Sequence, residues 1–81
     1  MRASVEISMY PLDAKYGTTI LNFISRLQQH DGLIVRSNSM STQVFGEYGE
    51  MMAILTKEMK QSFEEDKTVV MVMKLVNMDL T

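Results

Sequence analysis

The sequence contains no cysteine and no tryptophan, and it has only one proline and one histidine. Without cysteine, a disulfide framework, a thiolate nucleophile and a cysteine-ligated zinc site are all excluded. The single histidine, His30, lies beside Asp31 at the expected end of a helix, where a solvated cation near the helix dipole is the simplest interpretation. No set of nucleophile, base and orienting residue surrounds it. We therefore expect a protein that is not an enzyme.

Long apolar runs and an excess of basic residues are also missing. The formal net charge is −2, and the eight Lys and Arg residues are scattered along the chain, so nucleic acid is not an expected partner. No apolar run approaches the roughly 18 residues that span a bilayer, and no basic-then-apolar leader follows Met1. We expect a cytoplasmic protein that does not bind a membrane.

The acidic residues do not suggest a metal centre. Their spacing is that of charges in the first turn of a helix and in a solvated connector: Glu47, Glu50, Glu64, Glu65 and Asp66. The run 46–49 is too short and irregular for a loop that cradles phosphate. We expect no metal and no cofactor.

What is present is enough for one folded domain. The 81 residues are 46% hydrophobic and 22% charged, which is typical of a globular protein and places a single domain over residues 1–81. Nine residues are Met. Since Met fills irregular gaps, we interpret them as core residues, with a plastic contact surface as the alternative.

Hydrophobic periodicity in the first half predicts a strand and then a helix. Residues 3–10 alternate between apolar and polar side chains, and Pro11 ends the strand. Residues 17–30 carry apolar side chains at helical spacing, with Thr18 or Thr19 as the N-cap. The pair 31–32 closes this helix, because Gly tolerates a left-handed conformation.

The second half predicts two strands, a helix and a last strand. The strands cover residues 33–40 and 41–45, and the last strand covers residues 68–76. Between them residues 47–63 form an amphipathic helix, followed by a solvated connector at residues 64–67. Its expected apolar face is made of Tyr48, Met52, Leu55, Met59 and Phe63. This order predicts an α+β fold of the ferredoxin-like βαββαβ type, with one four-stranded antiparallel sheet and two helices on one face.

The last strand is apolar on both sides, which a strand with one face in water should not be. Val70, Val72 and Val76 point to the open face of the sheet. A second copy of the chain is the expected cover, so we predict a homo-oligomer, a dimer or a tetramer, assembled through this face. Glu6 and Lys74 project to the same face from neighbouring strands and are expected to pair.

Residues 38–42 concentrate amide and hydroxyl groups before the second helix, whose N-terminus offers free N–H donors. Two interpretations remain open for this run. It is either a turn or a pocket that hydrogen-bonds a small polar ligand.

Three segments together resemble the YkoF-like thiamine-binding family of ferredoxin-like domains. They are Ile7-Ser8-Met9-Tyr10-Pro11-Leu12, Met40-Ser41-Thr42-Gln43-Val44-Phe45-Gly46-Glu47 and Val69-Val70-Met71-Val72-Met73-Lys74. The likeness covers almost the whole chain. It departs from the family at Phe45, where relatives often place a polar residue, and at Glu6.

The resemblance implies binding of thiamine or its hydroxymethylpyrimidine part without turnover, in support of vitamin uptake or salvage. Ser8 and Thr42 match the family's ligand-contacting positions. Ser41 stands beside Thr42. Glu47 follows Gly46, and its carboxylate could hydrogen-bond an aminopyrimidine. The alternative function is an oligomeric regulatory or interaction module without a small-molecule ligand.

Overall fold

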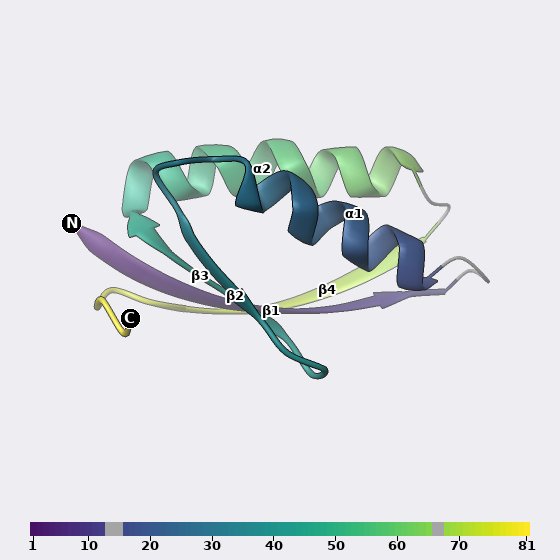
Figure 1. Ribbon diagram of the computed structural model, residues 1–81, viewed down its shortest axis with the longest axis horizontal. Coiled ribbons are helices and arrows are strands. Elements are labelled where there is room, and N and C mark those ends of the chain that lie inside the picture. Colours follow the sequence, from purple (N-terminus) through teal and green to yellow (C-terminus); the bar gives the residue numbers. More distant parts are fainter. Residues whose placement is uncertain (13–15, 66–67) are drawn as a thin grey trace.

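The computed structural model describes residues 1–12, 16–65 and 68–81, which form one antiparallel sheet with two helices on one face (Figure 1). The elements are β1 Arg2–Pro11, α1 Tyr16–Gln28, β2 Ile34–Ser37, β3 Thr42–Glu47, α2 Tyr48–Glu65 and β4 Val69–Val76. The strand order is β2-β3-β1-β4. The predicted ferredoxin-like βαββαβ fold is confirmed.

Strand β1 lies between β3 and β4 and sets the two faces of the sheet. Ile7 lies opposite Thr42 and Met73 on the helix face, and Glu6 lies opposite Gln43 and Lys74 on the open face. Alternation along β1 therefore separates core from surface as predicted. The core is made of buried apolar side chains from all layers: Ala3, Val5, Ile7, Phe23, Leu27, Leu33, Val44, Met51 and Leu55.

Helix α1 begins and ends differently from the prediction. It starts at Tyr16, so Thr18 and Thr19 lie inside its first turn and not at the cap. It ends at Gln28, and no described residue has a positive φ, so Gly32 does not close it in a left-handed conformation. Instead the chain tightens, and the N–H groups of residues 29 and 30 bond the carbonyls three residues earlier at 3.3 and 3.2 Å. These bonds satisfy the last carbonyls of the helix.

The buried face of α2 is also rotated from the predicted one. Its buried residues are Met51, Leu55, Glu58 and Ser62, whereas Tyr48 and Phe63 are 39% and 48% exposed. The helix turns this face inward because Glu58 and Ser62 both bind Arg26 of α1. It continues through Glu65, so residues 64 and 65 belong to the helix and not to a connector; residues 66–67 lie outside the described residues.

The methionines divide between the core and the surface. Met51 is buried in the core, and five others pack against it: Met9, Met52, Met59, Met71 and Met73. Met1, Met40 and Met78 are exposed. The interpretation of methionine as core filler holds for the first two groups.

The segment 77–81, which we call the tail, folds back under one end of the open face (Figure 1). The Ser4 hydroxyl donates to the Met78 carbonyl at 2.7 Å and accepts from the Leu80 N–H at 2.8 Å. Ser4 and Phe45 are consequently only 5% and 4% exposed, although both lie on the open face. The sequence analysis did not foresee this cover.

The rest of the open face stays uncovered by described residues. Tyr10, Val70 and Val72 are 54%, 43% and 53% exposed. Within the described residues no helix is long and apolar enough to cross a membrane.

Candidate functional site

A pocket of about 530 Å³ lies between the end of β1, the first half of α1 and the turn that joins β2 to β3. We call it the helix-face pocket. Its walls are largely apolar, with Ile7, Ile20 and Ile24 among them, and Ser41 and Thr42 line one edge. An apolar hollow of this size with a few polar groups at one edge is typical of small-molecule sites.

Thr42 is the buried polar residue of this pocket. It is 4% exposed and faces the helices from β3, on the same side as the fully buried Val44. Its hydroxyl has no hydrogen-bond partner among the described residues. Every side-chain polar atom of those residues that is fully enclosed by protein does have a partner. The Thr42 hydroxyl therefore reaches the pocket and is free to bond a molecule placed there.

The turn beside Thr42 is built by Asn38. The Asn38 side-chain oxygen accepts from the N–H groups of Met40 and Ser41 at 2.8 and 3.0 Å, and the Asn38 N–H bonds the Ser41 carbonyl at 3.1 Å. The turn interpretation is therefore correct for Asn38. The expected proximity to the second helix is wrong, because the full length of β3 separates this turn from α2.

Glu47 lies at the other end of β3 from Thr42 and caps helix α2. Its carboxylate accepts from the N–H groups of Glu50 at 2.9 Å and Gly49 at 3.1 Å, and it lies 3.7 Å from the amino group of Met1. The Glu50 N–H, followed by the Gly49 N–H, lowers the pKa of Glu47. The carboxylate thus stabilises the helix start.

Ser8 points to the open face, opposite Val72, and does not line the helix-face pocket. The structure therefore brings Ser41 and Thr42 together and leaves Ser8 and Glu47 apart from them. Ser41 also turns its hydroxyl to the open face, where it donates to Oε2 of Glu6 at 3.0 Å. Sequence reasoning missed the apolar wall from α1, because the spacing of Ile20 and Ile24 indicated core packing alone.

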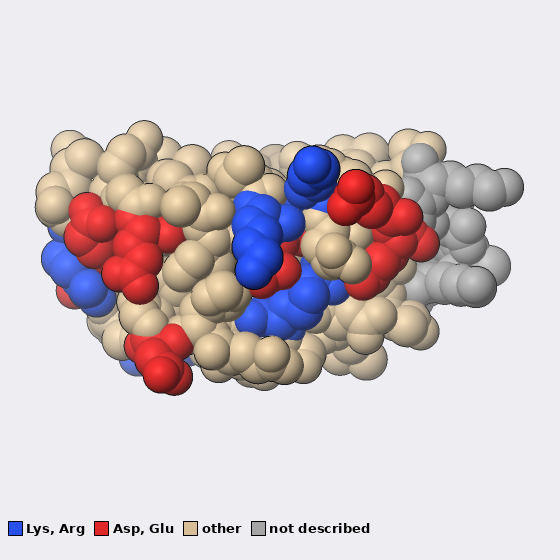
Figure 2. All heavy atoms as spheres, turned by 90° about the horizontal axis from the view of Figure 1, so that it is seen from above, with Lys and Arg blue, Asp and Glu red and all other residues tan. Residues whose placement is uncertain are grey.

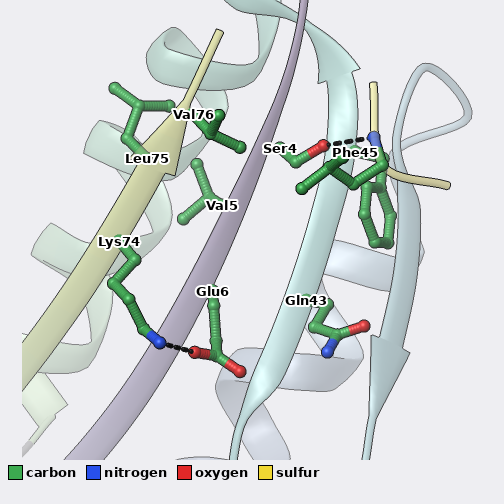
Figure 3. Close-up of a pocket in the computed structure, with 9 residues that line it drawn as sticks. Ser4, Val5, Glu6, Gln43, Phe45, Lys74, Leu75 and Val76 are labelled. Atoms are coloured by element: carbon green, nitrogen blue, oxygen red, sulfur yellow. Dashed lines mark hydrogen bonds and ion pairs between the residues drawn. The ribbon is translucent and has the colours of Figure 1, made fainter. Parts of the chain in front are cut away.

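The open face carries a second hollow, of about 600 Å³, which we call the open-face groove (Figure 3). Glu6, Gln43 and Lys74 line one end, and Phe45, Val76 and Leu80 line the other. Lys74 Nζ lies 3.0 Å from Oε1 of Glu6, which confirms the predicted pair. The Lys74 ammonium, followed by the Ser41 hydroxyl, lowers the pKa of Glu6. Sequence reasoning missed the tail, for which the only signal is the apolar pair Met78 and Leu80 after the last strand.

The sequence suggested a solvated His30, but its side chain contacts a buried carboxylate. Its Nε2 lies 2.8 Å from Oε2 of Glu58, a carboxylate of α2 that is 5% exposed. Arg26 binds the other carboxylate oxygen of Glu58 at 2.9 Å. The sequence signal for this cluster was weak: Glu58 follows Leu55 by three residues and so shares its buried side of the helix.

The outer surface of the helix layer carries mixed charge. In Figure 2 basic side chains lie near its middle, with acidic side chains on both sides. Among the described residues on this face, the pattern gives no continuous basic surface for a phosphate backbone. In residues 1–12, 16–65 and 68–81, no three His, Asp or Glu side chains are grouped so that they could hold a metal ion.

Comparison with known proteins shows the fold and no family. No protein-family description matches the chain, and no curated protein matches it. An X-ray structure of a protein from Streptococcus pneumoniae has a TM-score of 0.89 at 23% identity, covering 99% of this chain and 90% of that chain. A crystal structure from Thermotoga maritima, of a protein for which a role in thiamine biosynthesis or salvage has been suggested, has a TM-score of 0.85 at 19% identity, with coverages of 100% and 90%.

A domain of unknown function from Bacillus cereus has a TM-score of 0.76 at 16% identity, with coverages of 100% and 80%. At these identities the likeness extends to the fold alone. This chain is thus similar in architecture, over nearly its full length, to bacterial proteins of which one has been linked to thiamine.

Proposed function

We propose that the protein binds a small heteroaromatic molecule of the thiamine or hydroxymethylpyrimidine type in the helix-face pocket, without converting it. The observation that carries this proposal is Thr42, a residue that is 4% exposed and whose hydroxyl opens into the pocket without a partner in the described part of the chain. A ligand with a ring nitrogen or an amino group would supply the missing bond.

The shape and chemistry of the pocket support a flat, mostly apolar ligand. Isoleucine side chains from β1 and α1 form its sides, and the polar groups lie at one edge on the turn between β2 and β3. Such an arrangement favours a ring whose two faces contact the apolar walls and whose one edge hydrogen-bonds the polar groups. The suggested thiamine role of the similarly folded Thermotoga maritima protein supports the same ligand class.

Binding without turnover is part of the proposal. Neither His30 nor any Asp or Glu lines the described part of the helix-face pocket, so no general base among the described residues stands beside Thr42. Such a protein would deliver or buffer a vitamin precursor in the cytoplasm, in support of uptake or salvage.

Calorimetric titration with thiamine and with hydroxymethylpyrimidine tests the proposal. Thr42→Val keeps the shape of the side chain and removes the hydroxyl, so it should weaken binding about five- to thirty-fold, which corresponds to about 1–2 kcal/mol. Thr56→Val is the matched control, because Thr56 is exposed on α2 and its hydroxyl bonds only the Met52 carbonyl at 2.8 Å. Saturable binding that is equally strong in both variants would remove Thr42 from the site, and no binding of either compound would refute the proposal.

The exposed apolar part of the open face supports self-association as a second property. Tyr10, Val70 and Val72 form an uncovered patch beside the Glu6–Lys74 pair. A second copy related by a two-fold axis would present the same patch, so the apolar surfaces of the two copies could cover each other. We propose a dimer or a tetramer through this patch.

Light scattering at micromolar concentration measures the assembly directly. Val72→Lys should dissociate it, because an ammonium buried without a partner costs several kcal/mol. Leu21→Lys is the control, since Leu21 is 68% exposed on α1, away from the sheet. A monomeric wild-type protein would contradict self-association and favour a different partner for this face.

A further inference from the structure

We propose that the open-face groove is a second binding site, which takes small organic monocarboxylates with a compact hydrocarbon body. The groove lies on the face of the sheet opposite the helix-face pocket. Its ligand class is therefore independent of whether the first pocket binds a pyrimidine.

The tail turns this part of the sheet into a walled groove. Two hydrogen bonds to Ser4 hold it against the sheet, Arg36 donates to the Thr81 carbonyl at 3.1 Å, and Arg2 lies 3.6 Å from Asp79. Leu80 thereby stands on the groove's edge and is 56% exposed. A flat sheet surface offers one wall to a ligand, whereas this groove offers the sheet and the tail.

The apolar end of the groove fits a short branched or aromatic hydrocarbon. Val76 and Leu80 line it, and Phe45 forms part of the floor under the Arg36 guanidinium, which lies 5.4 Å from the centre of the ring. Val76 is 37% exposed, so its apolar surface faces the groove without a cover from described residues. Burial of this apolar surface against the hydrocarbon body of the ligand contributes favourably to the free energy of binding.

The polar end of the groove has spare donors and no spare carboxylate. Both oxygens of Glu6 are occupied, Oε1 by Lys74 at 3.0 Å and Oε2 by Ser41 at 3.0 Å. An ammonium group has three N–H donors, and Glu6 is the only described partner of Lys74, whose side chain is 82% exposed. The spare donors of Lys74 favour a ligand whose polar end accepts hydrogen bonds, and a negative charge would strengthen them.

The charges of the row across the sheet favour a ligand with one negative charge. Arg36, Gln43, Glu6 and Lys74 lie side by side on four strands, so two cations stand against one anion. A carboxylate brings this row to neutrality. A phosphate ester would place a second negative charge beside Glu6 and would be disfavoured.

Titration with 4-methylpentanoate, monitored by the backbone amide signals in NMR spectra, tests the site. The uncharged analogue of this acid, 4-methylpentanamide, is the comparison. We expect saturable binding of the acid, with shifts at Lys74, Val76 and Leu80 and none at Thr42. The amide should bind at least ten-fold more weakly, because it lacks the charge. Equal binding of the two compounds, or shifts confined to the helix face, would overturn the proposal.

Two variants with opposite expected effects separate binding from damage to the fold. Lys74→Gln should weaken the acid at least ten-fold, and Glu6→Gln should strengthen it a few-fold by releasing Lys74 and removing the neighbouring negative charge. Lys60→Gln, on the exposed side of α2, is the control and should change nothing. If both groove variants weakened binding alike, the ion pair would serve only the structure and the proposal would fail.

These experiments test the two proposed sites separately. Thiamine titrated in the presence of saturating acid should bind as it does alone, because the two hollows lie on opposite faces. Acid binding without thiamine binding would refute the proposed function and leave the groove intact. Competition between the two compounds would contradict a separate site.

Discussion

Arg26 of α1 and Glu58 of α2 are joined across the helix interface, with Nε of Arg26 2.9 Å from Oε1 of Glu58. The same guanidinium donates to the Glu58 carbonyl at 2.9 Å and to the Ser62 hydroxyl at 2.8 Å. His30 takes the second oxygen of the carboxylate. A carboxylate that is 5% exposed thus has partners on both oxygens, which is the condition for keeping a charge in the interior.

Removing Arg26 should destabilise the fold more than removing an ordinary surface charge. Arg26→Ala leaves Glu58 buried with only His30, so the free energy of unfolding should fall by about 3 kcal/mol. Lys60→Ala, an exposed change on α2, should stay within about 0.5 kcal/mol of the wild type. Urea unfolding measures both. If the double variant Arg26→Leu/Glu58→Leu were no more stable than Arg26→Ala, an uncompensated charge would not be the cause.

The Glu58 contribution should disappear in acid. Burial raises the pKa of Glu58, but the hydrogen bonds from His30 and Arg26 lower it by more than burial raises it. The pKa therefore lies below the ordinary value of 4.5. A carboxylate whose pKa is lowered by folding stabilises the protein above its unfolded pKa and loses this effect as the pH falls through its folded pKa. The stability gap between wild type and Glu58→Gln should shrink as the pH falls below about 4.5. Urea unfolding at each pH measures the gap, and a gap that widened in acid would contradict this assignment.

His30 should matter for stability and not for ligand binding. His30→Ala removes one bond to Glu58, which should lower the free energy of unfolding by about 1–2 kcal/mol. Because His30 lines neither hollow, the affinities for thiamine and for 4-methylpentanoate should not change. Gln29→Ala, at the exposed neighbouring position, is the control. Loss of a measured turnover in a folded His30→Ala protein would end the view that this is a binding protein.

Ser4 should control the attachment of the tail. Ser4→Ala breaks both hydrogen bonds that hold residues 78 and 80, so the Leu80 amide should exchange with solvent faster and stability should fall by about 1–2 kcal/mol. Ser8→Ala, four residues further along β1 on the same face, should have little effect on either quantity. Unchanged exchange at Leu80 would show that Arg36 and Asp79 hold the tail without Ser4.

Local patterns were sufficient for the sheet and for part of its surface chemistry. Alternation in β1 assigned Val5 and Ile7 to the core and Glu6 to the open face, because successive side chains of a strand point to opposite sides. The βαββαβ order then placed β4 beside β1, and the Glu6–Lys74 pair followed from that neighbourhood. Such features depend on periodicity and on connection order, both of which a sequence displays.

The sequence by itself therefore determined the architecture, the two faces of the sheet and the pairing of Glu6 with Lys74. Only the tertiary structure decided that Glu58 is buried against Arg26, that Ser4 holds the tail over Phe45, and that Thr42 opens into a pocket while Glu47 caps a helix at the far end of the same strand. The physical reason is that each of these depends on a partner from a distant segment. The periodicity of a segment indicates which of its sides is apolar. Whether a polar residue joins two helices, holds the tail or faces a pocket depends on which groups the rest of the chain brings within hydrogen-bonding distance.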